Sequence, residues 1–229
     1  MLSLLDRKSL AAALLSAVAL LTPAGAGASQ DGPPMTFEVT VEAIGLFGAL
    51  TLPDGSRLPA PISPGLYLVS SQEGALFRPG KTAGDGLESL AERGDAKPWL
   101  VELAANATGA AAYPFMHDQS FEIAARPGDR LFLAAMFVQS NDLFYAPGPE
   151  GIALFDAKGQ PFSGEVALQL KLWDAGTEVN EQPGLGANQA PRQATPESGV
   201  AENGTVHLVD DGFAYPATAD VVRVTIVAR

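Results

Sequence analysis

The feature that most limits how this chain can fold is a set of short runs in which every second residue is apolar. In residues 36–44, Phe, Val, Val and Ala alternate with Thr, Glu, Thr and Glu. Residues 221–228 at the end of the chain alternate in the same way. A period of two places one face of an extended strand in the core and the other in water. Both segments are therefore predicted to be half-buried β-strands.

Another run is apolar along almost its whole length. Residues 130–138 read RLFLAAMFV, which is typical of a strand that is covered on both faces. Further strands are predicted at residues 66–70, 121–125 and 165–173, and the sequence RPGD at 126–129 predicts a hairpin-like turn. Many short strands with Gly and Pro turns, and no alternation of strands with helices, predict an all-β fold, an antiparallel β-sandwich.

One short helix and one long loop complete the predicted domain. In residues 84–94, Asp85 is in position to cap the helix, Glu88 follows as in a capping box, and Gly94 ends it. Residues 179–204 are rich in Pro, Gly, Asn and Gln and poor in large apolar side chains. This composition predicts a long surface loop, and loops of this length in compact domains are usually functional or mobile.

The N-terminal segment has the layout of a secretory signal peptide. Two basic residues precede an uncharged stretch, residues 9–21, and small residues follow at 26–28. The stretch is shorter than the roughly 20 apolar residues of a typical membrane-spanning helix. We expect residues 1–28 to be a signal peptide and residues 29–229 to form one domain. The mature protein is then secreted or periplasmic, with no strong membrane anchoring.

Composition excludes several kinds of partner and site. The formal charge of the chain is −12, and about −13 remains once residues 1–28 are removed, because that segment carries one net positive charge. Such an acidic protein repels phosphate backbones, so nucleic acid is not expected as a partner. The chain has no cysteine and two histidines, which excludes disulfides and thiolate or His-rich zinc sites. A bound metal would have mainly oxygen ligands, as Ca²⁺ and Mg²⁺ have.

Two of the predicted strands run into acidic residues. Asp142 follows the apolar run 130–138, and Asp174 and Glu178 follow the run 165–173 with small residues between them. Carboxylates that lie close together repel one another unless a cation or a proton intervenes. From the residues alone, three interpretations stay open. They are a calcium site, a carboxylate pair serving as general acid and base in a hydrolase, and ordinary solvated turns.

Three stretches of the chain resemble the bacterial branch of the spondin-domain family. Residues 127–148, PGDRLFLAAMFVQSNDLFYAPG, resemble that family's strand and acidic loop. Residues 174–184, DAGTEVNEQPG, resemble its D-A-G-T-E-x-N motif, and residues 76–95 resemble its segment around L-A-E-x-G-D. The order and spacing of the three hold from about residue 36 to residue 229, almost the whole mature chain.

The resemblance implies a fold and a metal site. The fold would be an antiparallel β-sandwich similar to C2 domains. In the animal members a Ca²⁺ lies between loops, and the matching ligand positions here are Asp142, Asp174 and Glu178. The chain departs from the animal pattern by having Glu178 in place of an aspartate, and by lacking the cysteines of that domain. The longer Glu178 side chain requires a shifted ligand geometry.

These observations together predict an exported, calcium-binding, spondin-like interaction or adhesion module and not an enzyme. Its partner would be a protein or a surface glycan. A hydrolase acting through the same carboxylates remains the first alternative, and it predicts a deep cleft beside a carboxylate of raised pKa. A structural domain without metal is the second, and it predicts that the carboxylates point apart. We interpret His207 as a strand residue and not as a ligand.

Overall fold

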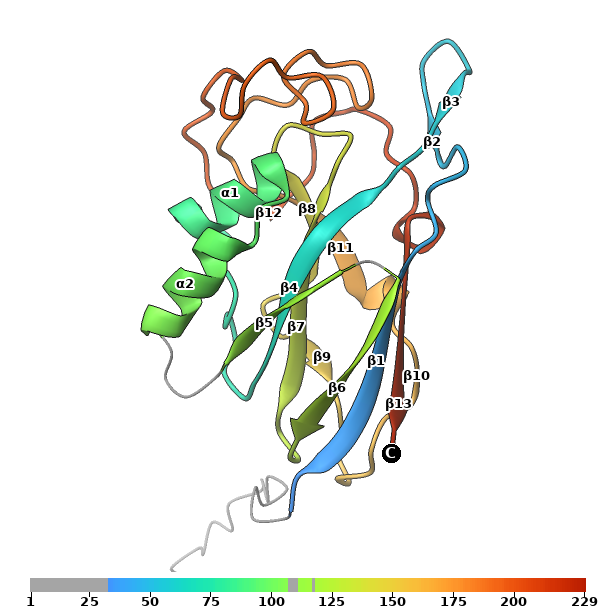
Figure 1. The fold of residues 1–229 in the computed structure, drawn as a ribbon, viewed down its shortest axis with the longest axis vertical. Coiled ribbons are helices and arrows are strands. Elements are labelled where there is room, and N and C mark those ends of the chain that lie inside the picture. Colours follow the sequence, from blue (N-terminus) through green and yellow to red (C-terminus); the bar gives the residue numbers. More distant parts are fainter. Residues whose placement is uncertain (1–32, 107–110, 117) are drawn as a thin grey trace, which may run out of the picture.

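The fold consists of two stacked antiparallel sheets, with two helices covering the outer face of one of them (Figure 1). The computed structural model describes residues 33–106, 111–116 and 118–229. The predicted signal peptide, residues 1–28, lies outside the described residues. The prediction of an all-β antiparallel sandwich is confirmed.

The smaller of the two main sheets has four strands. Their order is β10 (Gly164–Glu165), β13 (Val222–Ala228), β1 (Met35–Ala43) and β6 (Gln119–Ala125). The pairing of β1 with β13 joins the two ends of the described chain in the middle of this sheet. Strand β6 is one edge, since its only partner in the sheet order is β1.

The larger sheet has seven strands. Six follow one another in the order β12 (His207–Leu208), β11 (Leu170–Asp174), β8 (Leu143–Pro147), β7 (Arg130–Phe137), β4 (Ile62–Ser70) and β5 (Ala112–Phe115). The seventh, β9 (Ile152–Ala153), pairs with β7, and β2 (Leu50–Thr51) and β3 (Arg57–Leu58) form a separate ribbon. Asp142 immediately precedes β8 and Asp174 ends the neighbouring strand β11, so both acidic residues lie at the same end of this sheet.

The apolar residues of the strands form two hydrophobic cores, one on each face of the seven-stranded sheet. Between the sheets, Phe37 and Val39 of β1 pack in one cluster with Leu133 of β7. On the other face of the seven-stranded sheet, Phe132 of β7 packs in a second cluster with Leu90 of the first helix. Strand β7 is buried along seven of its eight residues, which explains its continuous apolar sequence.

Two helices cover the larger sheet, where one was predicted. Helix α1 (Asp85–Arg93) is the expected one, and Gly94 ends it with φ 68°. Its N-cap is Gly84 and not Asp85, and no side chain caps it. Helix α2 (Lys97–Asn106) was missed by the sequence analysis. A sequence signal does mark the start of this helix, since aspartate is a typical N-terminal capping residue. The Asp95 carboxylate accepts a hydrogen bond from Lys97 N at 3.0 Å.

Two local predictions are wrong, and both concern places where the chain passes between sheets. Residues 165–173 are not one strand: a 3₁₀ turn, Ala167–Gln169, separates β10 from β11 and leaves Leu168 exposed. The turn at residues 126–129 exists, with Asp129 N donating to Arg126 O at 2.9 Å. It is not a hairpin, however, because β6 and β7 belong to different sheets.

Candidate metal centre

The predicted acidic loops meet at one end of the larger sheet. Strands β8 and β11 pair so that Leu143 lies opposite Asp174, which places Asp142 and Asp174 next to each other. Both side chains are buried, with Asp142 fully enclosed. The loop at residues 179–204, drawn in orange at the top of Figure 1, covers this end of the molecule.

Asp142 is held by donors on one of its two carboxylate oxygens. Its Oδ2 accepts hydrogen bonds from Thr177 N at 2.7 Å, Thr177 Oγ1 at 3.1 Å and Glu178 N at 3.1 Å. Its Oδ1 is buried and has no hydrogen-bond partner. An enclosed carboxylate oxygen without a partner is unfavourable, so this atom is in position for a ligand that supplies positive charge.

Asp174 is anchored by its own turn. Its Oδ1 accepts a hydrogen bond from Gly176 N at 2.6 Å, and its Oδ2 accepts one from Asn180 Nδ2. Gly176 has φ 72°, and a Cβ at this position would lie 2.6 Å from Thr205 N. The glycine of the D-A-G-T-E motif is therefore required both by its backbone conformation and by the close approach of the neighbouring chain.

Glu202 is the third carboxylate of the cluster, and the sequence analysis missed it. One potential ligand atom each from Asp142, Asp174 and Glu202 lie within 4.8 Å of one another. Backbone pairing holds Glu202 here, since Glu202 N donates to Thr177 O at 2.9 Å. No local motif marks this residue, which lies in the predicted surface loop, so only the folded loop brings it to the site.

The Glu178 carboxylate does not belong to this cluster. Its Oε1 accepts a hydrogen bond from Gly199 N at 2.8 Å, and its Oε2 lies 3.4 Å from the Asn141 amide nitrogen. Of the three residues expected as ligands, the fold thus brings Asp142 and Asp174 together and directs the Glu178 side chain elsewhere. Glu178 still contributes its backbone N–H to Asp142 Oδ2.

The electrostatics follow from this crowding. Burial, and then the charge of Asp174, raises the pKa of Asp142 from 3.8 to about 7. Burial also raises the pKa of Asp174. The Nε2 atom of His207 lies 4.0 Å from Asp174 Oδ2 at the rim of the cluster. Because so few positive groups offset the carboxylates, the site requires either protons or a cation.

A second buried acid lies beside the cluster, on helix α1. Glu92 is only 3 % exposed, and its Oε2 has no hydrogen-bond partner. Burial raises the pKa of Glu92 to about 7, with a further contribution from the charge of Glu178. Glu92 and Glu178 form a second acidic pair, and a hydrogen bond with the Thr177 side chain partly offsets the rise in the pKa of Glu92.

Comparison with known proteins adds no assignment. No protein-family model matches the chain, and no curated protein matches it either. Among the described residues, no helix is long and apolar enough to cross a membrane.

Proposed function

We propose that this protein is an exported, spondin-like binding module that holds one Ca²⁺ between its acidic loops. The observation that carries the proposal is the unpartnered, buried Oδ1 of Asp142 beside the carboxylates of Asp174 and Glu202. Calcium takes about 6–8 oxygen ligands from carboxylates, carbonyls and water. The three carboxylates would supply the first of these ligands, and each carboxylate offers only oxygen atoms to a metal.

The sequence resemblance supports the same two central residues. Asp142 and Asp174 come from two separate spondin-like motifs, and they are neighbours across β8 and β11. We include in the proposal the C2-like form of the sandwich that the family implies. The proposal departs from the family in the third ligand, which we assign to Glu202, while Glu178 braces the loop through Gly199.

The role of the cation would be to order surface loops. Asp142 lies between β7 and β8, Asp174 ends β11, and Glu202 lies in the long loop. A calcium ion shared by the three would fix these segments against one another and offset their repulsion. The protein groups around it already orient the carboxylates, because backbone N–H groups hold Asp142 and Asp174 on their other sides.

The proposed setting is outside the cytoplasm, where the module would bind a protein or a surface glycan in adhesion. The signal-peptide layout of residues 1–28 supports export, and the negative charge disfavours nucleic acid. Expression in a bacterial host, followed by mass measurement of the protein in the periplasm and medium, tests this. Removal of residues 1–28 is the expected result, and a full-length cytoplasmic protein would contradict it.

One observation favours the hydrolase alternative, namely the pKa of about 7 for the Asp142 carboxyl. Such an enzyme also needs a cleft that admits a substrate. Two cavities of about 550 and 600 Å³ are lined by other residues, and Asp142 is fully enclosed. We therefore place this alternative second. Hydrolysis of chromogenic glycosides by the wild type and not by Asp142→Asn would revive it.

Thermal unfolding in the presence of calcium tests the calcium proposal. The protein is first treated with EDTA, and calcium or magnesium is then added back in steps. Because a ligand that binds only the folded state stabilises it by RT ln(1 + [L]/Kd), calcium should raise the unfolding midpoint in the wild type. Asp174→Asn should lose most of this rise.

The matched control is Asp156→Asn, which alters an exposed turn aspartate outside the acidic cluster. This variant should respond to calcium as the wild type does. If neither the wild type nor the control responds to calcium or magnesium, the cation proposal is wrong for this protein. The third interpretation, of acidic loops without metal, would then stand.

A further inference from the structure

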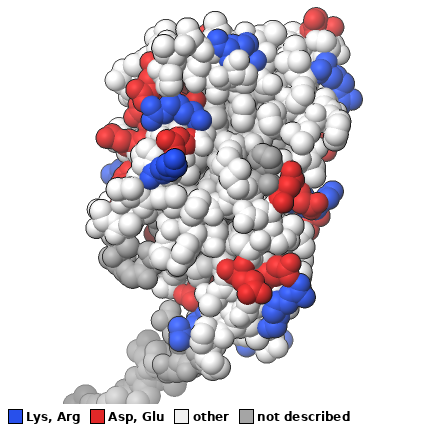
Figure 2. Space-filling model, viewed as in Figure 1, with Lys and Arg blue, Asp and Glu red and all other residues white. Residues whose placement is uncertain are grey.

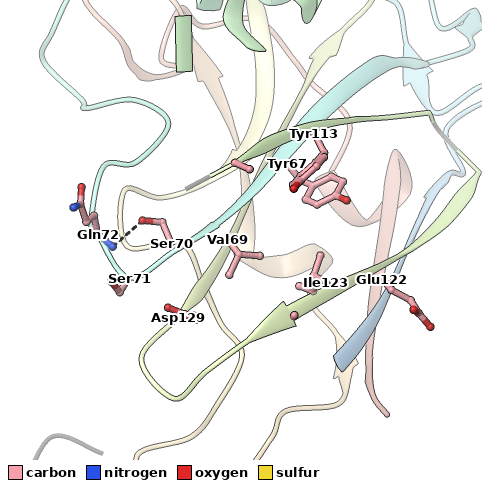
Figure 3. Close-up of a pocket in the computed structure, with 11 residues that line it drawn as sticks. Tyr67, Val69, Ser70, Ser71, Gln72, Tyr113, Glu122, Ile123 and Asp129 are labelled. Carbon is pink, nitrogen blue, oxygen red and sulfur yellow. Dashed lines mark hydrogen bonds between the residues drawn. The ribbon is translucent and has the colours of Figure 1, made fainter. Parts of the chain in front are cut away.

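A cavity of about 550 Å³ opens on the side of the sandwich, between the edges of the two sheets. Figure 3 shows Tyr67 and Val69 of β4 and Tyr113 of β5 on one side of it, with Ile123 of β6 directed inward from the other side. Its size is within the range of about 300–1,000 Å³ that is usual for ligand sites. Nothing in the calcium proposal uses this region.

The cavity is bounded by strand edges that have no further strand partner among the described residues. Strand β6 is the edge of the four-stranded sheet and is seven residues long, without proline or lysine. Strand β5 pairs with β4 only as far as Ala112 opposite Leu68, so within the part of the chain that the structure describes Val69 and Ser70 have no strand partner on that side. Free edges of this kind expose rows of backbone N–H and C=O groups that can pair with an added strand.

One wall of the cavity suits apolar side chains, whereas the rest of its lining is largely polar. Tyr67 stacks on Phe121 with ring centroids 4.0 Å apart, and Tyr113 stacks on Tyr67 at 5.6 Å. This aromatic stack closes one end of the cavity, and Tyr113 remains 52 % exposed at its rim. Side chains that point inward from an added strand would meet these rings together with Val69 and Ile123.

The outer face of β6 is acidic. Glu122 lies at the rim of the cavity and is exposed, and its carboxylate end points away from the other labelled side chains in Figure 3. The register of β1 with β6 puts it opposite Glu38, and like charges in that position repel. Arg229 forms an ion pair with Glu38, whereas no ion pair is formed by Glu122 among the described residues. Figure 2 shows acidic and basic groups together over the lower part of these strands.

We propose that the free edge of β6 is a strand-addition site for an extended peptide segment of a partner protein. The segment has apolar residues at every second position, which enter the cavity, and a lysine or arginine on the outer face beside Glu122. Main-chain hydrogen bonds supply affinity in this mode of recognition, and the alternate side chains supply specificity.

A second copy of this chain is a poorer occupant. Edge-to-edge pairing of two β6 strands would bring together two outer faces that each carry Glu122 and Glu38, on proteins that each have a formal charge of −12. Cross-strand pairs of like charge are destabilising, and opposite charges are favourable. The charge of the site therefore selects a basic segment from another protein.

This inference deepens the proposed binding module, on which it rests for its extracellular setting, by naming the chemistry of a partner. It does not depend on the cation site, which lies at the end of the sheet near β8 and β11. Binding of a peptide at β6 should therefore be the same in EDTA and in calcium. Failure of the calcium proposal would appear as a missing calcium response, and failure of this proposal would appear as missing peptide binding. The two failures can therefore be told apart.

The test uses a blocked heptapeptide of alternating valine with threonine or lysine as the probe. Calorimetric titration should show that it binds the wild type, and hydrogen exchange should show new protection in residues 119–125. A peptide with glutamate for lysine should bind about three- to tenfold more weakly, because cross-strand charge pairs differ by that amount. A peptide with a central proline, which cannot donate its N–H, should bind more weakly as well.

Charge reversal at Glu122 provides the matched test in the protein. Glu122→Lys should reverse the preference, so that the glutamate peptide binds more tightly than the lysine peptide by about three- to tenfold. The control Glu165→Lys alters β10, at the opposite edge of the same sheet, and should leave both affinities unchanged. Both side chains are exposed, so neither change should prevent folding.

Four results would overturn the proposal. One is the absence of lysine-peptide binding at about millimolar concentration, where even weak strand addition is measurable. The second is an unchanged charge preference in Glu122→Lys, and the third is exchange protection outside residues 119–125. The fourth is concentration-dependent protection of β6 by the protein alone, which would identify a second copy as the occupant.

Discussion

Two acidic regions lie near each other at the loop end of this protein, and they differ in how many carboxylates converge. Asp142, Asp174, Glu92 and Glu178 are buried, whereas Glu202 is exposed. In the cluster, the Glu202 carboxylate lies close to those of Asp142 and Asp174. One carboxylate oxygen of Asp142 and one of Asp174 each accept a hydrogen bond from a backbone N–H group. In the neighbouring pair, the charge of Glu178 adds to the rise in the pKa of Glu92, and Gly199 N donates a hydrogen bond to one oxygen of Glu178.

On the calcium proposal, this difference in geometry decides which region binds a cation and which takes up a proton. A calcium ion needs several oxygens directed at one point, which the cluster offers and the pair does not. The pair can instead lower its repulsion by protonation, in keeping with the pKa of about 7 for Glu92. The cluster should therefore respond to calcium and the pair to pH. The following experiments test that division.

The largest expected effect is the pH dependence of the metal-free protein. The pKa of Asp142 is about 7 in the folded state and 3.8 ordinarily, so its contribution to stability is complete below 3.8 and is lost as pH rises through 7. In EDTA, the free energy of unfolding should fall by up to a few kcal/mol between about pH 5 and pH 8. Urea unfolding across this range measures it.

Asp142→Asn should make this slope smaller, because the variant has no carboxyl to ionise at that position. Saturating calcium should also oppose the slope in the wild type, since a bound cation favours the ionised carboxylate. A slope that is equal in Asp142→Asn and the wild type would show that another group controls the pH response.

The next effect concerns the turn that positions Asp174. Gly176→Ala should lower the free energy of unfolding by about 2–4 kcal/mol, because the backbone has a positive φ and the new Cβ meets Thr205 N. Gly55→Ala is the control, since it has φ 84° but open space around it, and should cost about 1 kcal/mol. Equal losses in urea unfolding would mean that the close approach at Gly176 is unimportant.

The choice of third ligand should appear in calcium affinity. Glu202→Gln should raise the Kd for calcium about 10- to 100-fold, because it removes one of the three converging carboxylates. Glu178→Gln should change that Kd by less than about threefold. Calorimetric titration of both variants decides the assignment. If Glu178→Gln has the larger effect, the ligand set implied by the spondin resemblance is correct.

The smallest effect is expected at the acidic pair. The pKa of Glu92 is raised, so its ionisation above about pH 7 destabilises the folded state, and protonation at lower pH relieves the cost. Glu92→Gln should therefore stabilise the protein by about 1 kcal/mol at pH 8 and have little effect at pH 5. Chemical unfolding at both pH values tests this, and a change in calcium affinity would contradict the separation of pair and cluster.

Much of the fold could be predicted because its signals are local. The period-two pattern predicted β1 and β13, and the continuous apolar run predicted that β7 is covered on both faces. The sites where the chain changes sheets could not be predicted in the same way. The alternation continues through residues 165–173 although a 3₁₀ turn interrupts it, and only the placement of the two sheets explains why Leu168 faces solvent.

In the candidate site, too, some residues could be predicted from the sequence and others could not. Asp142 immediately precedes β8 and Asp174 ends β11, and these two strands are neighbours. The sequence analysis predicted no strand at residues 143–147, so the resemblance to the spondin family, and not the strand pattern, implied that the two carboxylates share a site. Glu202 is placed by backbone pairing across the long loop, and a spacing argument contains no information about that pairing. Glu178 follows Asp174 in the motif, yet its longer side chain reaches Gly199 instead of the cluster.

Calorimetric titration of calcium into the EDTA-treated and dialysed protein, with the Asp142→Asn variant beside it, is the decisive test of the calcium site. We expect one calcium per chain in the wild type, release of protons on binding near neutral pH, and loss of binding in the variant. Proton release is expected because calcium displaces the proton that the raised pKa of Asp142 retains. The absence of calcium binding in the wild type, or equal binding in the variant, would contradict it.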